Sequence, residues 1–146
     1  MKCLRAMALV CLMFAMVLGP ASAARAGASD LVIVVDETSP IRSISVADVR
    51  RRFLGIPLVV DGVEVVPVRN VSNADFYELF LQRVLFMSAP SYERRMLNKV
   101  FREGGDRILA VTSNEELYRA LRNDPRRISF VPRAAVRSNL RIVAEP

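Results

Sequence analysis

Hydrophobic residues form short unbroken runs along the chain, and these runs predict β-strands. Residues 31–35 are all aliphatic, which is typical of a strand covered on both faces. Val65, Val66 and Val68 form a second strand of the same kind. Residues 58–66 predict a hairpin around an Asp61-Gly62 turn, whose second arm continues into this second strand. The other strands are expected at 128–131 and 140–143, with a short strand or an extended segment at 108–111.

Between the strands, apolar residues recur at helical spacing and predict four helices. Two begin with a capping box, Ser45 to Asp48 and Ser113 to Glu116. The others are expected from residue 75 to about 87, and from 89 to the glycines at 104 and 105. In the latter helix the residues expected to face inward are Met96, Leu97, Val100 and Phe101. Strands that alternate with helices predict an α/β fold, a mostly parallel sheet flanked by helices.

The first 26 residues have the three parts of a secretory signal peptide. Lys2 and Arg5 precede an apolar run that is short for a membrane span, and small residues at 21–26 offer a cleavage site. We therefore expect a signal peptide at 1–26, a single domain at 27–146 and a periplasmic or secreted protein. No stable membrane insertion is expected after cleavage.

Composition excludes several kinds of chemistry from the mature chain. The sequence has no histidine, and both cysteines, Cys3 and Cys11, lie in the signal peptide. Histidine bases, thiolate nucleophiles and the usual zinc ligands are therefore missing, so we expect no cofactor and no enzyme. Cleavage after Ala26 leaves 18 basic and 15 acidic residues, a net charge of +3. This excess is too small to predict nucleic-acid binding.

The turn after the second strand is the strongest candidate for a binding site. Arg69 ends the strand, and Ser72 and Asn73 precede a helix, so backbone N–H groups and a helix dipole are expected at the edge of the sheet. Such a corner favours a small anion. Thr38 follows the first strand and is expected at a neighbouring strand end. Each residue also has an ordinary structural role: Ser72 or Asn73 as a helix cap, Arg69 as an ion-pair partner and Thr38 as a turn residue.

The order of these elements resembles the small, single-lobe members of the phosphate-type (type II) periplasmic substrate-binding protein family. The resemblance rests on the helix end at 53–55, the strand at 65–68 and the segment 124–132, and it covers the whole mature chain. It implies the fold of one lobe of a type II periplasmic binding protein. It further implies a role like that of the solute-binding component of a phosphate ABC transporter, with Arg69, Ser72 and Asn73 at the position of the family's phosphate loop. The expected ligand residues for phosphate or a related anion are then Arg69, Ser72 and Asn73, with Thr38 at the neighbouring strand end.

The candidate loop departs from the family pattern in two ways. It contains no glycine, and Asp75 stands near the position of an expected hydroxyl. The chain is also about one lobe long. A second interpretation therefore stays open, a periplasmic interaction or sensor accessory module that has lost high-affinity ligand binding and docks on another envelope protein.

Overall fold

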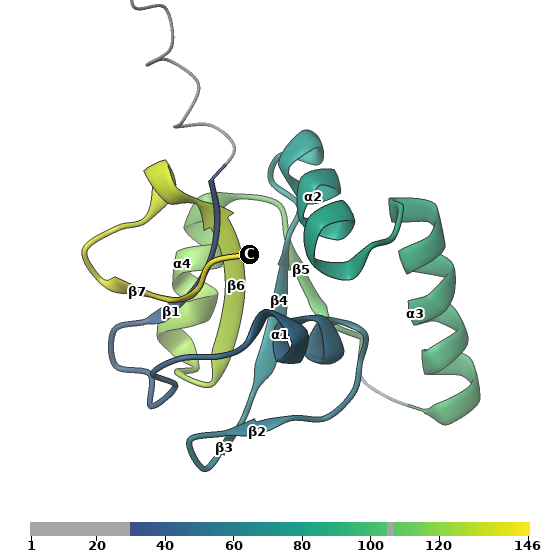
Figure 1. Ribbon diagram of the computed structural model, residues 1–146, viewed down its shortest axis with the longest axis horizontal. Helices are drawn as coiled ribbons and strands as arrows, with labels where there is room; N and C mark the ends of the chain where they lie inside the picture. The colour runs from purple at the N-terminus through teal and green to yellow at the C-terminus, as the bar shows by residue number, and fades with distance from the viewer. Residues whose placement is uncertain (1–29, 105–106) are drawn as a thin grey trace, which may run out of the picture.

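A five-stranded sheet of order β5-β4-β6-β1-β7 forms the middle of the computed structural model, which describes residues 30–104 and 107–146 (Figure 1). Its strands are β1 (Leu31–Asp36), β4 (Val66–Asn70), β5 (Leu109–Val111), β6 (Arg127–Pro132) and β7 (Leu140–Ala144). β4 is parallel to β5 and β6, whereas β1 is antiparallel to β6 and β7. Every strand except β1 thus points in one direction, which confirms the expected mostly parallel sheet.

Helices cover both faces of this sheet. They are α1 (Val46–Phe53), α2 (Ala74–Phe80), the π-helical turn η1 (Leu81–Leu85), α3 (Ala89–Glu103), α4 (Asn114–Asn123) and the 3-10 turn η2 (Arg133–Ala135). Leu31, Ile33 and Val35 of β1 belong to the hydrophobic cluster that includes α1, α2 and η1. Val32 and Val34 belong to the cluster on the α4 side. The expectation that residues 31–35 form a strand covered on both faces is confirmed.

The predicted hairpin forms, but it is separate from the main sheet. β2 (Val59–Val60) pairs with β3 (Val63–Glu64), and Asp61 and Gly62 have positive φ values of 50° and 80°. Positive φ values at both positions are typical of the tight turn that an Asp-Gly pair favours. The expectation that the second arm runs on as the central strand is wrong: the two hairpin strands form a sheet of their own, and β4 begins only after the fully buried Val65.

Both predicted capping boxes begin helices. Ser45 Oγ accepts a hydrogen bond from the backbone N–H of Asp48 at 3.0 Å, and Ser113 Oγ accepts from that of Glu116 at 3.2 Å. The Glu116 carboxylate in turn accepts from the backbone N–H of Thr112 at 2.9 Å. The two serine bonds satisfy amides that a helix leaves unpaired in its first turn, and the Glu116 bond ties the residue before the cap to α4.

The outer helix α3 has one buried residue, Tyr92, whose hydroxyl donates to the Phe53 carbonyl at 2.8 Å. The expectation that Leu97 and Phe101 face inward is wrong, since they are 42% and 77% exposed. Helical spacing identifies an apolar stripe, but it does not say how much of the stripe a neighbouring element covers.

Within the described ranges, no helix combines the length and apolar character needed to cross a membrane. The expected signal peptide at 1–26 lies outside the described residues.

Candidate binding pocket

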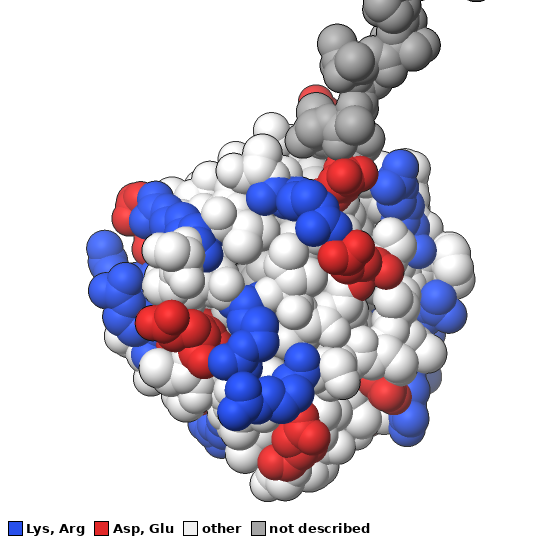
Figure 2. Space-filling model, turned by 60° about the vertical axis from the view of Figure 1, so that its left-hand side comes forward, with Lys and Arg blue, Asp and Glu red and all other residues white. Residues whose placement is uncertain are grey.

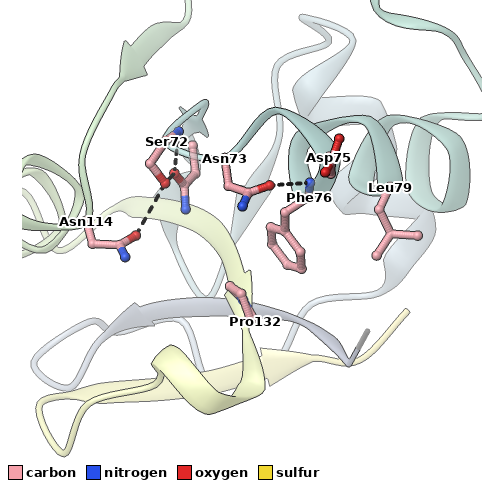
Figure 3. Close-up of a pocket in the computed structure, with 8 residues that line it drawn as sticks. Ser72, Asn73, Asp75, Phe76, Leu79, Asn114 and Pro132 are labelled. Carbon is pink, nitrogen blue, oxygen red and sulfur yellow. Dashed lines mark hydrogen bonds between the residues drawn. The ribbon is translucent and has the colours of Figure 1, made fainter. Parts of the chain in front are cut away.

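A pocket of about 450 Å³ lies at the edge of the sheet where β4, β5 and β6 end. The three strands are parallel to one another, so their carboxyl ends meet at this edge. In open α/β sheets, ligands commonly bind at this edge. The pocket is lined by the turn from β4 into α2, the first residue of α4 and the last residue of β6: Asn70, Ser72, Asn73, Asp75, Phe76, Leu79, Asn114 and Pro132 (Figure 3).

The Asn70 side chain organises the turn from β4 into α2. It is 3% exposed, and its Nδ2 donates to the Phe130 carbonyl of β6 at 3.2 Å. Its Oδ1 accepts from Ser72 twice, from the backbone N–H at 3.2 Å and from the hydroxyl at 2.6 Å. An amide side chain that bonds to the backbone two residues ahead folds the chain back on itself. Asn70 thus ties the turn to the centre of the sheet.

Two helices begin at the pocket. Asn73 caps α2, because its Oδ1 accepts from the backbone N–H of Phe76 at 2.9 Å. Asn114 is the first residue of α4, and its Oδ1 lies 3.4 Å from the Ser72 hydroxyl (Figure 3). The expected turn from a strand into a helix at residues 70–74 is therefore confirmed, and it lies at the same edge as the ends of β5 and β6.

The pocket offers mainly neutral polar groups and one apolar wall. The amide groups of Asn73 and Asn114 retain Nδ2 donors after their Oδ1 atoms have formed the bonds described above. Phe76 and Leu79 lie on the side of α2 that faces Pro132 (Figure 3). The one charged residue among the described lining residues is Asp75, in the first turn of α2. The described part of the chain has no cluster of acidic, cysteine or histidine residues suited to a metal ion.

The structure brings two of the four predicted site residues to the pocket. Ser72 and Asn73 line it, as expected for the turn. Arg69 does not, because it points to the other side of β4. Its Nη1 lies 2.5 Å from Glu93 Oε1 and 3.5 Å from the Tyr77 hydroxyl. Through these two contacts Arg69 links β4 to α3 and to α2. Burial raises the pKa of Tyr77, although the nearby Arg69 opposes that shift.

Thr38 lies at the opposite edge of the sheet. β1 is antiparallel to β6, so that Leu31 pairs with Pro132 and the strand ends away from the pocket. The Thr38 hydroxyl donates to Asp36 Oδ1 at 2.6 Å and completes a turn. The expectation that Thr38 lies at a neighbouring strand end on the same edge is wrong for this reason.

Six of the eight lining residues are not among the predicted binding residues, and the neutral polar ones of these are Asn70, which was expected only as part of the turn, and Asn114. Asn70 is the last residue of β4, and a buried asparagine after an aliphatic strand is a local sign of such a turn. The local sequence around Asn114 gives a weaker indication of a binding site, because Asn114 simply follows a helix cap. The start of α4 comes to lie beside the turn only through the parallel pairing of Asn70 with Val111.

Comparisons with known proteins give a match of fold but none of sequence. No family model matches the chain, and no curated protein matches it. Among solved structures, a putative phosphate ABC transporter substrate-binding protein with bound phosphate from Clostridium perfringens aligns with a TM-score of 0.55 and 10% identity, over 80% of this chain and 45% of that one. An ABC-type phosphate transport receptor from Vibrio cholerae aligns over 80% of this chain and 46% of that one, with 13% identity and a TM-score of 0.49.

The resemblance is one of fold. The chain has the α/β architecture of part of the Clostridium perfringens protein, which confirms the resemblance expected from the sequence at the level of the fold. The chain spans less than half the length of the solved receptors it matches. At such low identity, the match does not establish that the ligand is shared.

Proposed function

We propose that the chain is an exported binding module for phosphate or a related oxyanion, like the solute-binding component of a phosphate ABC transporter. The ligand would lie in the pocket at the ends of β4, β5 and β6. The observation that carries this proposal is the convergence there of Ser72, Asn73 and Asn114, the polar residues at two helix starts. Helix starts favour anions because their backbone N–H groups are unpaired and their dipoles are positive.

The fold supports the same ligand class. The Clostridium perfringens protein that shares this fold was solved with bound phosphate. In the present chain the proposed donors are the Nδ2 groups of Asn73 and Asn114 and the backbone amides of Ala74 and Asp75, since the Phe76 amide already donates to Asn73 Oδ1. Arg69 is excluded from this set, because Glu93 and Tyr77 hold it on the other side of β4.

We expect the affinity for an oxyanion to be modest. The pocket opens to solvent on one side, and hydrogen bonds in a water-exposed site are worth less than in an enclosed one. The Asp75 carboxylate also adds a negative charge next to the site. Both features weaken binding relative to a fully enclosed anion site.

A second function is favoured by the composition of the turn from β4 into α2. Residues 69–75 contain no glycine, and Asp75 places a carboxylate at the pocket. An interaction or sensor accessory module in the cell envelope, without high-affinity ligand binding, is consistent with these features.

Thermal unfolding in the presence of inorganic phosphate or sulfate distinguishes the two functions. Binding to the native state raises the melting temperature as ligand concentration increases. The double variant Asn73→Ser/Asn114→Ala removes both proposed Nδ2 donors and keeps a hydroxyl that can cap α2, so it should lose this increase. Asn98→Ala, which alters an exposed asparagine on α3, should keep it. An unchanged melting temperature at about 10 mM of either anion would reject the oxyanion function and favour the second one.

A further inference from the structure

A second concave surface lies between α3 and the turn that follows α1, with a volume of about 590 Å³. We call it the α3 groove. It shares no lining residue with the pocket at the ends of β4, β5 and β6. Its charged side chains all come from α3: the basic residues Arg94, Arg95, Lys99 and Arg102 and the acidic residue Glu103. The groove therefore has a net charge of +3.

Three of these cations have no partner in the described part of the chain. Lys99 forms an ion pair with Glu103. The guanidinium groups of Arg94, Arg95 and Arg102 form neither an ion pair nor a hydrogen bond among the described residues, and all three side chains are exposed. The one carboxylate in the groove, Glu103, is paired with Lys99, so these three positive charges together strengthen the local potential.

Other parts of the surface differ from this groove. On the face that comes forward in Figure 2, basic and acidic side chains lie next to one another. Arginines outside α3 often have a carboxylate partner, as in the pairs of Arg137 with Glu115 at 2.6 Å and Arg133 with Glu145 at 2.7 Å. The α3 groove is thus a local concentration of uncompensated positive charge.

The groove also has an apolar side. Leu54 and Ile56 line it, and Ile56 is 37% exposed. Gly55 lies between them with φ +80°, and a Cβ there would lie 2.6 Å from two carbon atoms of the Lys99 side chain. The positive φ is one that favours glycine, and the Lys99 side chain packs against this turn beside the groove.

We propose that the α3 groove binds an acidic polypeptide segment of a partner protein. Charge complementarity requires carboxylates opposite Arg94, Arg95 and Arg102. The apolar residues Leu54 and Ile56 provide contact for an aliphatic side chain of the same segment. The concave shape favours a chain segment over a flat lipid surface. From Ser91 to Glu103 the helix is about 18 Å long, which matches about five extended residues.

A labelled peptide of about eight residues, in which glutamate alternates with leucine and serine, tests this proposal. Its fluorescence anisotropy should rise to saturation as the purified protein is added at low ionic strength. The response should weaken with salt, because exposed charge pairs are screened. A peptide with glutamine in place of glutamate should not bind. Absence of saturable binding of the acidic peptide up to about 1 mM protein would overturn the proposal.

Matched variants locate the contact. Arg95→Gln/Arg102→Gln should weaken peptide binding by about tenfold, which is the scale of two lost charge contacts. The control variant Arg119→Gln/Arg122→Gln removes two exposed arginines of α4. It should change the affinity for the peptide by less than about twofold. Ile56→Ser should weaken peptide binding and leave the phosphate response unchanged. Equal losses in the two arginine variants would contradict the assignment to the groove.

Two further measurements test other occupants. In the first, the protein should not sediment with phosphatidylcholine vesicles that contain phosphatidylglycerol. In the second, the protein should not form a dimer that is lost in the variant Arg95→Gln/Arg102→Gln. Either result would overturn the proposal in favour of a lipid surface or a second copy. Peptide binding is independent of the phosphate response, so failure of one proposal leaves the other intact.

Discussion

Replacement of Asn70 by alanine tests whether this side chain holds the binding turn in place. Asn70 is 3% exposed and takes part in three hydrogen bonds, one to the Phe130 carbonyl and two from Ser72. At about 1 kcal/mol for each bond, Asn70→Ala should lower the free energy of unfolding by about 3 kcal/mol. The turn should also lose its order, so that any phosphate response of the protein weakens.

Urea unfolding followed by circular dichroism measures this loss. The midpoint should fall while the m-value stays constant, since the surface exposed on unfolding is nearly unchanged. Ser72→Ala removes the hydroxyl bond to Asn70 at 2.6 Å and the longer contact with Asn114 at 3.4 Å, and should cost about 1 kcal/mol. In a double-mutant cycle, Asn70→Ala and Ser72→Ala should show a coupling of about 1 kcal/mol, because the two side chains contact each other.

Asn98→Ala is the matched control, because Asn98 is an exposed asparagine on α3. Its free energy of unfolding should change by less than about 0.5 kcal/mol. If Asn70→Ala costs less than about 1 kcal/mol, or if the control costs as much, the turn does not depend on the Asn70 bonds and the reasoning is refuted.

Three further predictions concern the pocket, the buried Tyr92 and the outer helix. Asp75→Asn should raise the affinity for inorganic phosphate by about threefold in calorimetric titration, because a charge next to the anion is removed; an unchanged or lower affinity would place the anion elsewhere. It should also lower the melting temperature slightly, since α2 loses a favourable charge in its first turn. Burial raises the pKa of Tyr92, so the unfolded chain releases this proton above about pH 10 while the folded chain keeps it. Stability should therefore fall as the pH rises above that value, and Tyr92→Phe should flatten the decline measured by urea unfolding; an identical decline in the variant would exclude Tyr92 as a cause. Phe101→Ser should change the free energy of unfolding by less than about 0.5 kcal/mol because Phe101 is 77% exposed, and a larger loss would show that α3 packs more tightly than described.

Local sequence signals predicted much of the fold. The aliphatic run at 31–35, the Asp61-Gly62 turn and the two capping boxes each depend on neighbouring residues, and each corresponds to an element of the structure. The turn from β4 into α2 belongs to the same group, because the cap that Asn73 provides is local. These features need no information about distant contacts.

The errors concern contacts between distant parts of the chain. Nothing in residues 31–35 specifies that β1 runs antiparallel to its neighbours, and this direction moves Thr38 to the opposite edge. Arg69 forms an ion pair with Glu93, which lies 24 positions later in the sequence. The two side chains meet only when α3 packs beside β4. The exposure of Phe101 likewise depends on where α3 lies relative to the sheet. Pairing and packing of this kind are tertiary properties that local patterns do not encode.

Titration of the isotope-labelled protein with inorganic phosphate, followed by amide chemical shifts, tests the central claim most directly. The account predicts saturable shifts of the amides at 71–76 and 113–115, around the pocket where β4, β5 and β6 end. The same titration of Asn73→Ser/Asn114→Ala should show much weaker shifts at these positions. Shifts confined to Arg94, Arg95 and Arg102 of the α3 groove, or no shifts at any phosphate concentration, would contradict it.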